Sequence, residues 1–153
     1  MGLTNLFSLK IKTEEFDAVA KKPVLLKSLR KLTLHPGSGM NHELDHLTES
    51  AETRSVNAKV LLAYKNKKLV AWALLSREKS DFCFARHYHG YEPSQGALFE
   101  VFVDQDYRKQ GIGSALLKAA RRKAGSLRLC VAPWDYQSTR FYQNFSHYKN
   151  VEM

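Results

Sequence analysis

The sequence has few cysteines and no long apolar run, and both absences narrow the class of protein. Its 153 residues include only two cysteines, Cys83 and Cys130. Two thiols in a chain of this length do not make a disulfide framework, and both lie in apolar, strand-like surroundings. We therefore expect two buried thiols in a reducing compartment. No apolar run approaches the roughly 18 residues that a membrane-spanning helix needs, so we expect no membrane partner.

The first residues also lack targeting features. Residues 1–7 do not have the charged, apolar and small-residue order of a signal peptide. Leu6 stands where an N-myristoylation pattern needs serine or threonine. Together with the cysteine usage, these absences predict a cytoplasmic protein. The length predicts a single domain over residues 1–153.

Acidic residues are scarce beside basic ones. The chain has 24 Lys and Arg against 15 Asp and Glu, which gives a net charge of +9. This excess favours an anionic partner, either a nucleic acid or a phosphate-rich cofactor. The cations occur in scattered groups such as Lys65–Lys68 and Arg121–Lys123, which is more typical of solvated faces than of a nucleic-acid footprint. Nucleic acid is therefore an open alternative and not the favoured partner.

Hydrophobic periodicity in the first third of the chain predicts one strand and two helices. Alternation over residues 7–12 predicts a half-buried strand. Thr13 is expected to cap a helix that begins at Glu14 and is ended by Pro23. Leucines spaced over residues 25–32 predict a second helix.

The remaining two thirds predict a central sheet. Apolar segments 59–64 and 69–75 predict two central strands joined by a turn at residues 65–68, and residues 97–103 predict a further strand. A helix over residues 111–124 follows, and then a strand over 127–131 and a last helix that begins at Asp135. This order predicts a mixed α/β fold.

A glycine-containing turn joins the strongest predicted strand to the helix after it. Gly111 and Gly113 let the backbone approach a phosphate closely, and the helix N-terminus offers unpaired N–H donors and a favourable dipole. Arg108 and Lys109 can add countercharge. The glycine spacing alone also fits an ordinary turn. A Rossmann fingerprint needs a third glycine where Leu116 stands, and a Walker loop needs a Gly-Lys-Ser/Thr that is absent.

The wider segment resembles the pyrophosphate motif of the GNAT N-acetyltransferases. Residues 103–117 read Val-Asp-Gln-Asp-Tyr-Arg-Lys-Gln-Gly-Ile-Gly-Ser-Ala-Leu-Leu, which matches that family's strand end, acidic turn, aromatic-Arg pair, Gly-x-Gly and apolar helix. Residues 129–142 resemble the family's last motif, with Asp135 for the usual Asn and Ser138 for the usual Ala. The resemblance is specific over residues 98–142, and its part from Glu100 to Tyr142 is nearest to the diamine acetyltransferases.

The resemblance implies a GNAT fold, in which helices flank a mixed, mostly antiparallel sheet, and acetyl-CoA as the co-substrate. It implies that the cofactor is bound by residues of the strand end, the loop and the last motif, namely Val101, Phe102, Val103, Arg108, Lys109, Gln110, Gly111, Ile112, Gly113, Ser114, Asp135 and Ser138. It also implies an amine acceptor, which could be a polyamine, a lysine side chain or a protein N-terminus. Homodimers are common in the family.

Two side chains are candidates for proton transfer. In the family the amine attacks the thioester directly, so an ammonium group must first lose a proton, and the leaving thiolate needs one. Tyr142 matches the family's general-acid tyrosine, although it also fits a core aromatic. Glu100 is the only carboxylate on the strand before the loop and is a candidate base. Many family members carry this acid one residue earlier, where Phe99 stands.

Two further features of the first half of the chain suggest an acceptor-binding surface and a metal site. Acids gather between residues 43 and 52, where the family's acceptor side lies, and we hypothesise that they face a cationic acceptor; a solvated helix face is the alternative. His42-Glu43-Leu44-Asp45-His46 also satisfies the His-Glu-x-x-His pattern of a zinc hydrolase, although a third ligand is not apparent. A GNAT domain that has lost catalysis and only binds a protein or nucleic acid is another alternative.

Overall fold

The computed structural model describes residues 8–33, 40–82 and 96–129. Its strands are β1 (Leu9–Glu15), β2 (Lys59–Lys65), β3 (Lys68–Ser76), β4 (Ala97–Val103) and β5 (Leu127–Leu129). Its helices are α2 (Phe16–Ala20), α3 (Pro23–Leu32), α4 (Met40–Ala51) and α5 (Ile112–Ala124), with short 3-10 turns η1 (Lys79–Asp81) and η4 (Gln105–Tyr107). No helix among these residues is long and apolar enough to cross a membrane.

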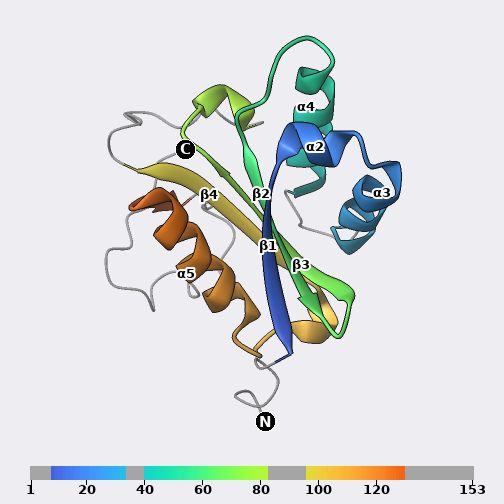
Figure 1. Cartoon of the computed structure of the whole chain (residues 1–153), viewed down its shortest axis with the longest axis vertical. Helices are drawn as coiled ribbons and strands as arrows, with labels where there is room; N and C mark the ends of the chain where they lie inside the picture. Colours follow the sequence, from blue (N-terminus) through green and yellow to red (C-terminus); the bar gives the residue numbers. More distant parts are fainter. Residues whose placement is uncertain (1–7, 34–39, 83–95, 130–153) are drawn as a thin grey trace.

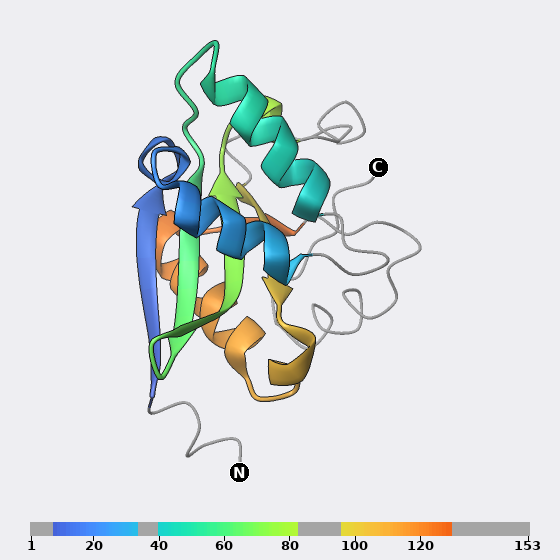
Figure 2. The ribbon, with the colours of Figure 1, turned by 90° about the vertical axis from the view of Figure 1, so that its right-hand side faces the viewer.

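The five strands form one sheet in sequence order, β1-β2-β3-β4-β5. The first three neighbouring pairs are antiparallel, and β4 and β5 run parallel. The α/β fold with a mixed, mostly antiparallel sheet is therefore confirmed. Helices α2, α3 and α4 cover one face and α5 covers the other (Figures 1 and 2).

The central strands β2 and β3 contribute side chains to two hydrophobic cores, one on each face of the sheet. Val70 to Ser76 of β3 are all buried, because the strand has helices on each side. Trp72 and Leu74 pack toward α2, α3 and α4, while Ala71 and Ala73 pack toward α5. The small side chains toward α5 let the helix lie close to the sheet.

The turn between β2 and β3 fixes the register of the hairpin. Asn66 and Lys67 have φ values of 51° and 67°. Two consecutive residues with positive φ are typical of a two-residue hairpin turn whose twist matches that of the strands. The turn ends beside the C-terminus of β4, because Ala71 pairs with Val103.

The predicted boundary between the first strand and helix is wrong. Thr13 does not cap a helix at Glu14, because β1 continues to Glu15, where it pairs with Lys59 of β2. The helix begins only at Phe16, whose N–H donates to the Ala58 carbonyl at 2.9 Å. Thr13 is a favourable N-cap residue, but pairing of Glu14 and Glu15 with β2 keeps both residues in the strand. Lys59, the partner of Glu15 in the sheet and in an ion pair, is 44 residues away in the sequence.

Candidate cofactor and catalytic site

A tight turn carries the chain from β4 to α5. The Asp104 N–H donates to the Val70 carbonyl at 2.9 Å, which ends β4 against β3. The Asp104 carboxylate then accepts from the Asp106 N–H at 3.0 Å, and its carbonyl accepts from the Tyr107 N–H at 2.8 Å. This aspartate-capped turn is the acidic turn of the sequence motif, and its role in the structure is to shape the loop.

The loop enters α5 through left-handed backbone. Lys109 has a φ of 62° and Gly111 a φ of 85°, and Gly111 is the N-cap of α5. The Gly111 carbonyl accepts the first helical hydrogen bond, from the Ala115 N–H at 3.0 Å. The amides before Ala115 are the N–H groups that a helix cannot pair internally. The first turn contains no acid, so these donors face no competing carboxylate from their own helix.

Arg108 holds the loop against the end of β4. Its Nε donates to the Val103 carbonyl at 3.1 Å, and its guanidinium lies 5.5 Å from the centre of the Phe102 ring. The sequence predicted Arg108 as countercharge for a phosphate. The structure adds that part of the guanidinium fixes the backbone of the loop.

The β2–β3 hairpin supports the same loop from the other side. Lys65 Nζ donates to Gln110 Oε1 at 2.8 Å. Lys65 and Lys68 also lie over the Tyr107 ring, with ammonium-to-centroid distances of 5.9 and 5.1 Å. The sequence alone predicts only a turn at residues 65–68. The signal that could have placed them here is the strand order, which brings the β2–β3 turn beside the end of β4.

Within the described part of the chain, the edge of β4 that faces β5 is paired only at Ala97–Phe99. β5 pairs with Ala97–Phe99, and the Asp104 N–H points to β3. Since backbone groups alternate in direction along a strand, the Phe102 amide also faces β3, whereas those of Val101 and Val103 face the other edge. The Arg108 contact with the Val103 carbonyl agrees with this alternation. Among the described residues, β5 pairs with neither valine.

Gly96, directly before β4, lets the strand start close to the backbone that follows α5. Gly96 has a φ of 132°, and a Cβ there would lie 3.0 Å from backbone atoms of Ser126 and Leu127. The next residue, Ala97, donates its N–H to the Ser126 carbonyl at 3.0 Å. Only glycine permits this close approach of β4 to the end of α5.

Glu100 lies on the sheet face opposite α5. It alternates with Leu98 and Phe102, which pack in the core under α2, α3 and α4, whereas Phe99 packs toward α5. Leu98 and Phe102 are buried, whereas Glu100 is only partly buried. The carboxylate therefore lies in an apolar row on the face of β4 away from α5.

A protein-family model matches the part of the chain that contains this site. The model described as the acetyltransferase (GNAT) family matches residues 26–147, which includes β4, the loop and α5. The chain belongs to the GNAT acetyltransferase family. As a GNAT enzyme it is an acetyltransferase that takes its acetyl group from acetyl-CoA.

Solved structures of acetyltransferases share the fold. The aminoglycoside N-acetyltransferase AAC(6')-Iy in complex with CoA has a TM-score of 0.62 and 16% identity, over 95% of this chain and 90% of that chain. The 6'-N-acetyltransferase AAC(6')-IG from Acinetobacter haemolyticus has a TM-score of 0.58 and 20% identity, over 94% and 95%. YncA from Salmonella typhimurium, with acetyl-CoA, has a TM-score of 0.55 and 15% identity, over 89% and 77%.

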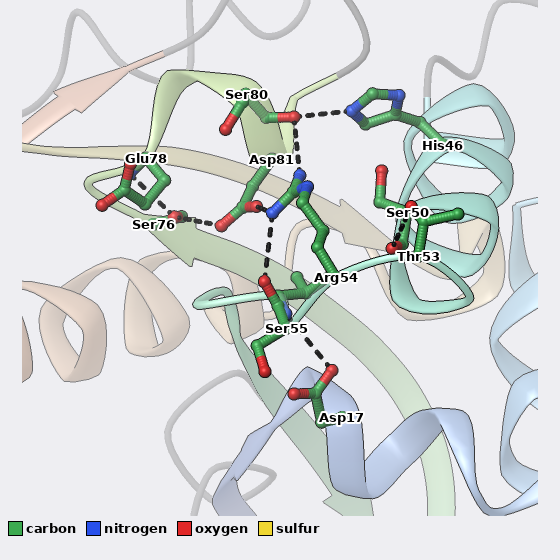
Figure 3. A network of polar contacts seen from close by, with 11 residues as sticks. Asp17, His46, Ser50, Thr53, Arg54, Ser55, Ser76, Glu78, Ser80 and Asp81 are labelled. Atoms are coloured by element: carbon green, nitrogen blue, oxygen red, sulfur yellow. Dashed lines mark hydrogen bonds and ion pairs between the residues drawn. The ribbon is translucent and has the colours of Figure 1, made fainter.

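The His-Glu-x-x-His motif lies on α4 of this GNAT domain. His42 is exposed and Glu43 is buried. His46 Nε2 lies 2.7 Å from the Ser80 carbonyl oxygen, so this nitrogen donates a hydrogen and is not a metal ligand (Figure 3). Within residues 8–33, 40–82 and 96–129, no three His, Cys, Asp or Glu side chains come together as a metal site. The described residues do not support the zinc-hydrolase alternative.

Three of the four acids between residues 43 and 52 are exposed. Glu43 is buried, and Asp45 pairs with Arg30 of α3 at an N–O distance of 2.6 Å. Glu49 and Glu52 are exposed. Burial excludes Glu43 from an acidic acceptor surface, and the hypothesis stays a prediction for Asp45, Glu49 and Glu52.

Several predicted residues lie outside the described ranges. They are the last-motif residues Asp135, Ser138 and Tyr142 and the two cysteines, Cys83 and Cys130. The roles of Asp135, Ser138 and Tyr142 stay predictions.

Proposed function

We propose that this acetyltransferase transfers the acetyl group of acetyl-CoA to a primary amine by direct attack. The observation that carries the proposal is that the Val101–Val103 end of β4 and the N-terminus of α5 are joined by the loop at residues 104–111. The loop amides from Gly111 to Ser114 suit the pyrophosphate, and the Val101 and Val103 backbone suits the pantetheine arm and the thioester. Lys109 and Gln110 border the same phosphate site, and the match over residues 26–147 supports one domain over residues 1–153.

The reaction needs two proton transfers. The amine nitrogen forms a bond to the thioester carbon as it loses a proton to Glu100, directly or through water. The carbon–sulfur bond then breaks, and Tyr142 gives a proton to the departing thiolate. Glu100 suits the first role because it lies on the face away from α5, so an amine can approach the thioester from the side of α4.

The acceptor is a polyamine, a lysine side chain or a protein N-terminus. The aminoglycoside acetyltransferases that share the fold add a further class of primary amine to test. We expect at least one of four probes to accelerate thiol release from acetyl-CoA and to gain an acetyl group by mass spectrometry: spermidine, an Nα-blocked lysine peptide, a peptide with a free N-terminus and kanamycin. Binding of acetyl-CoA without acceleration by any amine would instead indicate a domain that has lost catalysis.

We expect Glu100→Gln to lower kcat about 100-fold near pH 7, because general-base catalysis contributes roughly 10²–10⁴. The KM for acetyl-CoA should not change. The variant should recover rate as the pH rises toward the amine pKa, near 10.4 for an alkylammonium, because the neutral amine then needs no base. Glu78→Gln, an exposed acid that follows β3, is the matched control. Equal kcat in both variants, or no recovery with pH, would remove Glu100 as the base.

A further inference from the structure

The solvent face of α5 carries a cationic stripe. Lys118, Arg121, Arg122 and Gly125 are spaced as i, i+3, i+4 and i+7, so they lie on one side of the helix, and all four are exposed. The opposite side consists of buried residues, namely Ile112, Leu116, Leu117 and Ala120. The four exposed residues line an open hollow of about 420 Å³. We call this surface the α5 basic face.

No acid neutralises the α5 basic face among the described residues. The helix contains no Asp or Glu, and the four ion pairs found in the described part of the chain use other cations. Arg77 lies beside the stripe, because its Nη2 donates to the Ala124 carbonyl at 2.7 Å. The helix dipole favours cations in the last turn, which covers Arg121 and Arg122. Lys118 lies before that turn, so the dipole does not account for the whole stripe.

The α5 basic face is distinct from the cofactor loop. The loop is at the N-terminus of α5, and Gly125 follows its C-terminus (Figure 1). At a rise of about 1.5 Å per residue, Lys118 lies roughly 10 Å and Arg122 roughly 16 Å along the helix axis from Gly111. The pyrophosphate at the loop therefore does not explain the cations at the far end.

We propose that the α5 basic face binds the phosphate backbone of a nucleic acid. Cations repeated along a helix match a regular array of phosphates, and a net charge of +9 draws the polyanion to the protein. An anionic membrane is the less suitable partner, because surface helices that bind bilayers insert apolar side chains. Among the described residues, the only exposed large hydrophobic is Val24, which lies on α3 across the sheet.

The test compares two triple variants with the same loss of charge. Lys118→Gln/Arg121→Gln/Arg122→Gln removes the stripe, and Lys21→Gln/Lys27→Gln/Lys31→Gln removes three exposed cations on the other side of the sheet. Fluorescence anisotropy with a labelled 20-base-pair DNA duplex is measured from about 50 to 200 mM salt. We expect the α5 variant to bind about 10-fold more weakly than the control variant at 100 mM salt, with a log–log salt slope flatter by about 2–3. Arg121→Lys/Arg122→Lys keeps the charge and should bind like the wild type.

Three outcomes would overturn the proposal. Equal weakening in both triple variants would indicate a diffuse effect of net charge. Stronger binding to phosphatidylserine vesicles than to DNA, lost in the α5 variant alone, would assign the face to a membrane. A higher KM for acetyl-CoA but not for dephospho-CoA thioester in the α5 variant would assign it to the cofactor. Failure of DNA binding leaves thiol release intact, so it is distinguishable from failure of the proposed function.

Discussion

Gly111→Glu is expected to weaken acetyl-CoA binding by at least about 100-fold. Gly111 is the N-cap of α5 and has a φ of 85°, a conformation that a residue with a Cβ adopts with strain. The new carboxylate would accept the helix N–H donors meant for a phosphate and would repel the phosphate itself. Each charge-assisted hydrogen bond lost is worth about 1.5–3 kcal/mol, so two such bonds exceed the stated effect. Isothermal titration with acetyl-CoA measures it.

Gly125→Glu is the matched control for this substitution. Gly125 caps the other end of the same helix with a φ of 84°, and nothing lies within 4 Å of a Cβ there. The control therefore carries backbone strain and a new carboxylate without touching the loop. We expect its affinity for acetyl-CoA to stay within about three-fold of the wild type, since the change lies roughly 20 Å from the loop. Equal affinities of the two variants would show that the N-terminus of α5 is not the phosphate site.

Arg54→Ala is expected to lower the free energy of unfolding by about 2–3 kcal/mol. Arg54 Nη1 lies 2.9 Å from the carboxylate of Asp81, whose side chain is 0% exposed. That carboxylate also accepts from Ser76 Oγ at 2.7 Å, and Arg54 Nη2 donates to the Ser80 carbonyl at 3.1 Å (Figure 3). Loss of the guanidinium leaves the buried Asp81 carboxylate with the Ser76 hydroxyl as its hydrogen-bond donor and releases the link between the end of α4 and the end of β3. The effect falls below that of a fully buried pair because Arg54 is 36% exposed.

Urea unfolding of a small set of variants separates the charge from the packing. Adding Asp81→Asn to Arg54→Ala removes the unpaired charge and keeps an acceptor for Ser76, so it should recover part of the loss. Arg30→Ala breaks the Arg30–Asp45 pair, whose side chains are 44% and 52% exposed, and should cost less than about 1 kcal/mol. An equal loss for Arg30→Ala and Arg54→Ala would contradict a special role for the buried pair.

The central strands, the cofactor loop and α5 were predictable because their signals are local. Residues 97–103 form β4 with the predicted bounds, and Gly125 ends α5 as predicted. The helix spacing and the glycines are contained in one stretch of about thirty residues. Of the three residues predicted at the strand end, Phe102 turns its amide toward β3, whereas Val101 and Val103 turn theirs away from β3.

Contacts between residues far apart in the sequence were not predictable in this way. Arg54 and Asp81 are 27 residues apart, and Lys65 and Gln110 are 45 apart. No propensity or spacing rule connects such positions, because the sheet order brings them together. The same reason explains the wrong helix start at Glu14, where pairing with β2 prolongs the strand.

Thermal unfolding with two thioesters tests the central claim that the loop at the start of α5 binds acetyl-CoA through its phosphates. One ligand is acetyl-CoA, and the other is acetyl-pantetheine, which carries the thioester without the pyrophosphate. At about 100 times its Kd, acetyl-CoA should stabilise the full chain by about 2.7 kcal/mol. This corresponds to a rise in Tm of about 5–10 °C for a domain of this size. At the same concentration acetyl-pantetheine should leave Tm unchanged, whereas equal shifts with both ligands, or no shift with acetyl-CoA, would contradict the account.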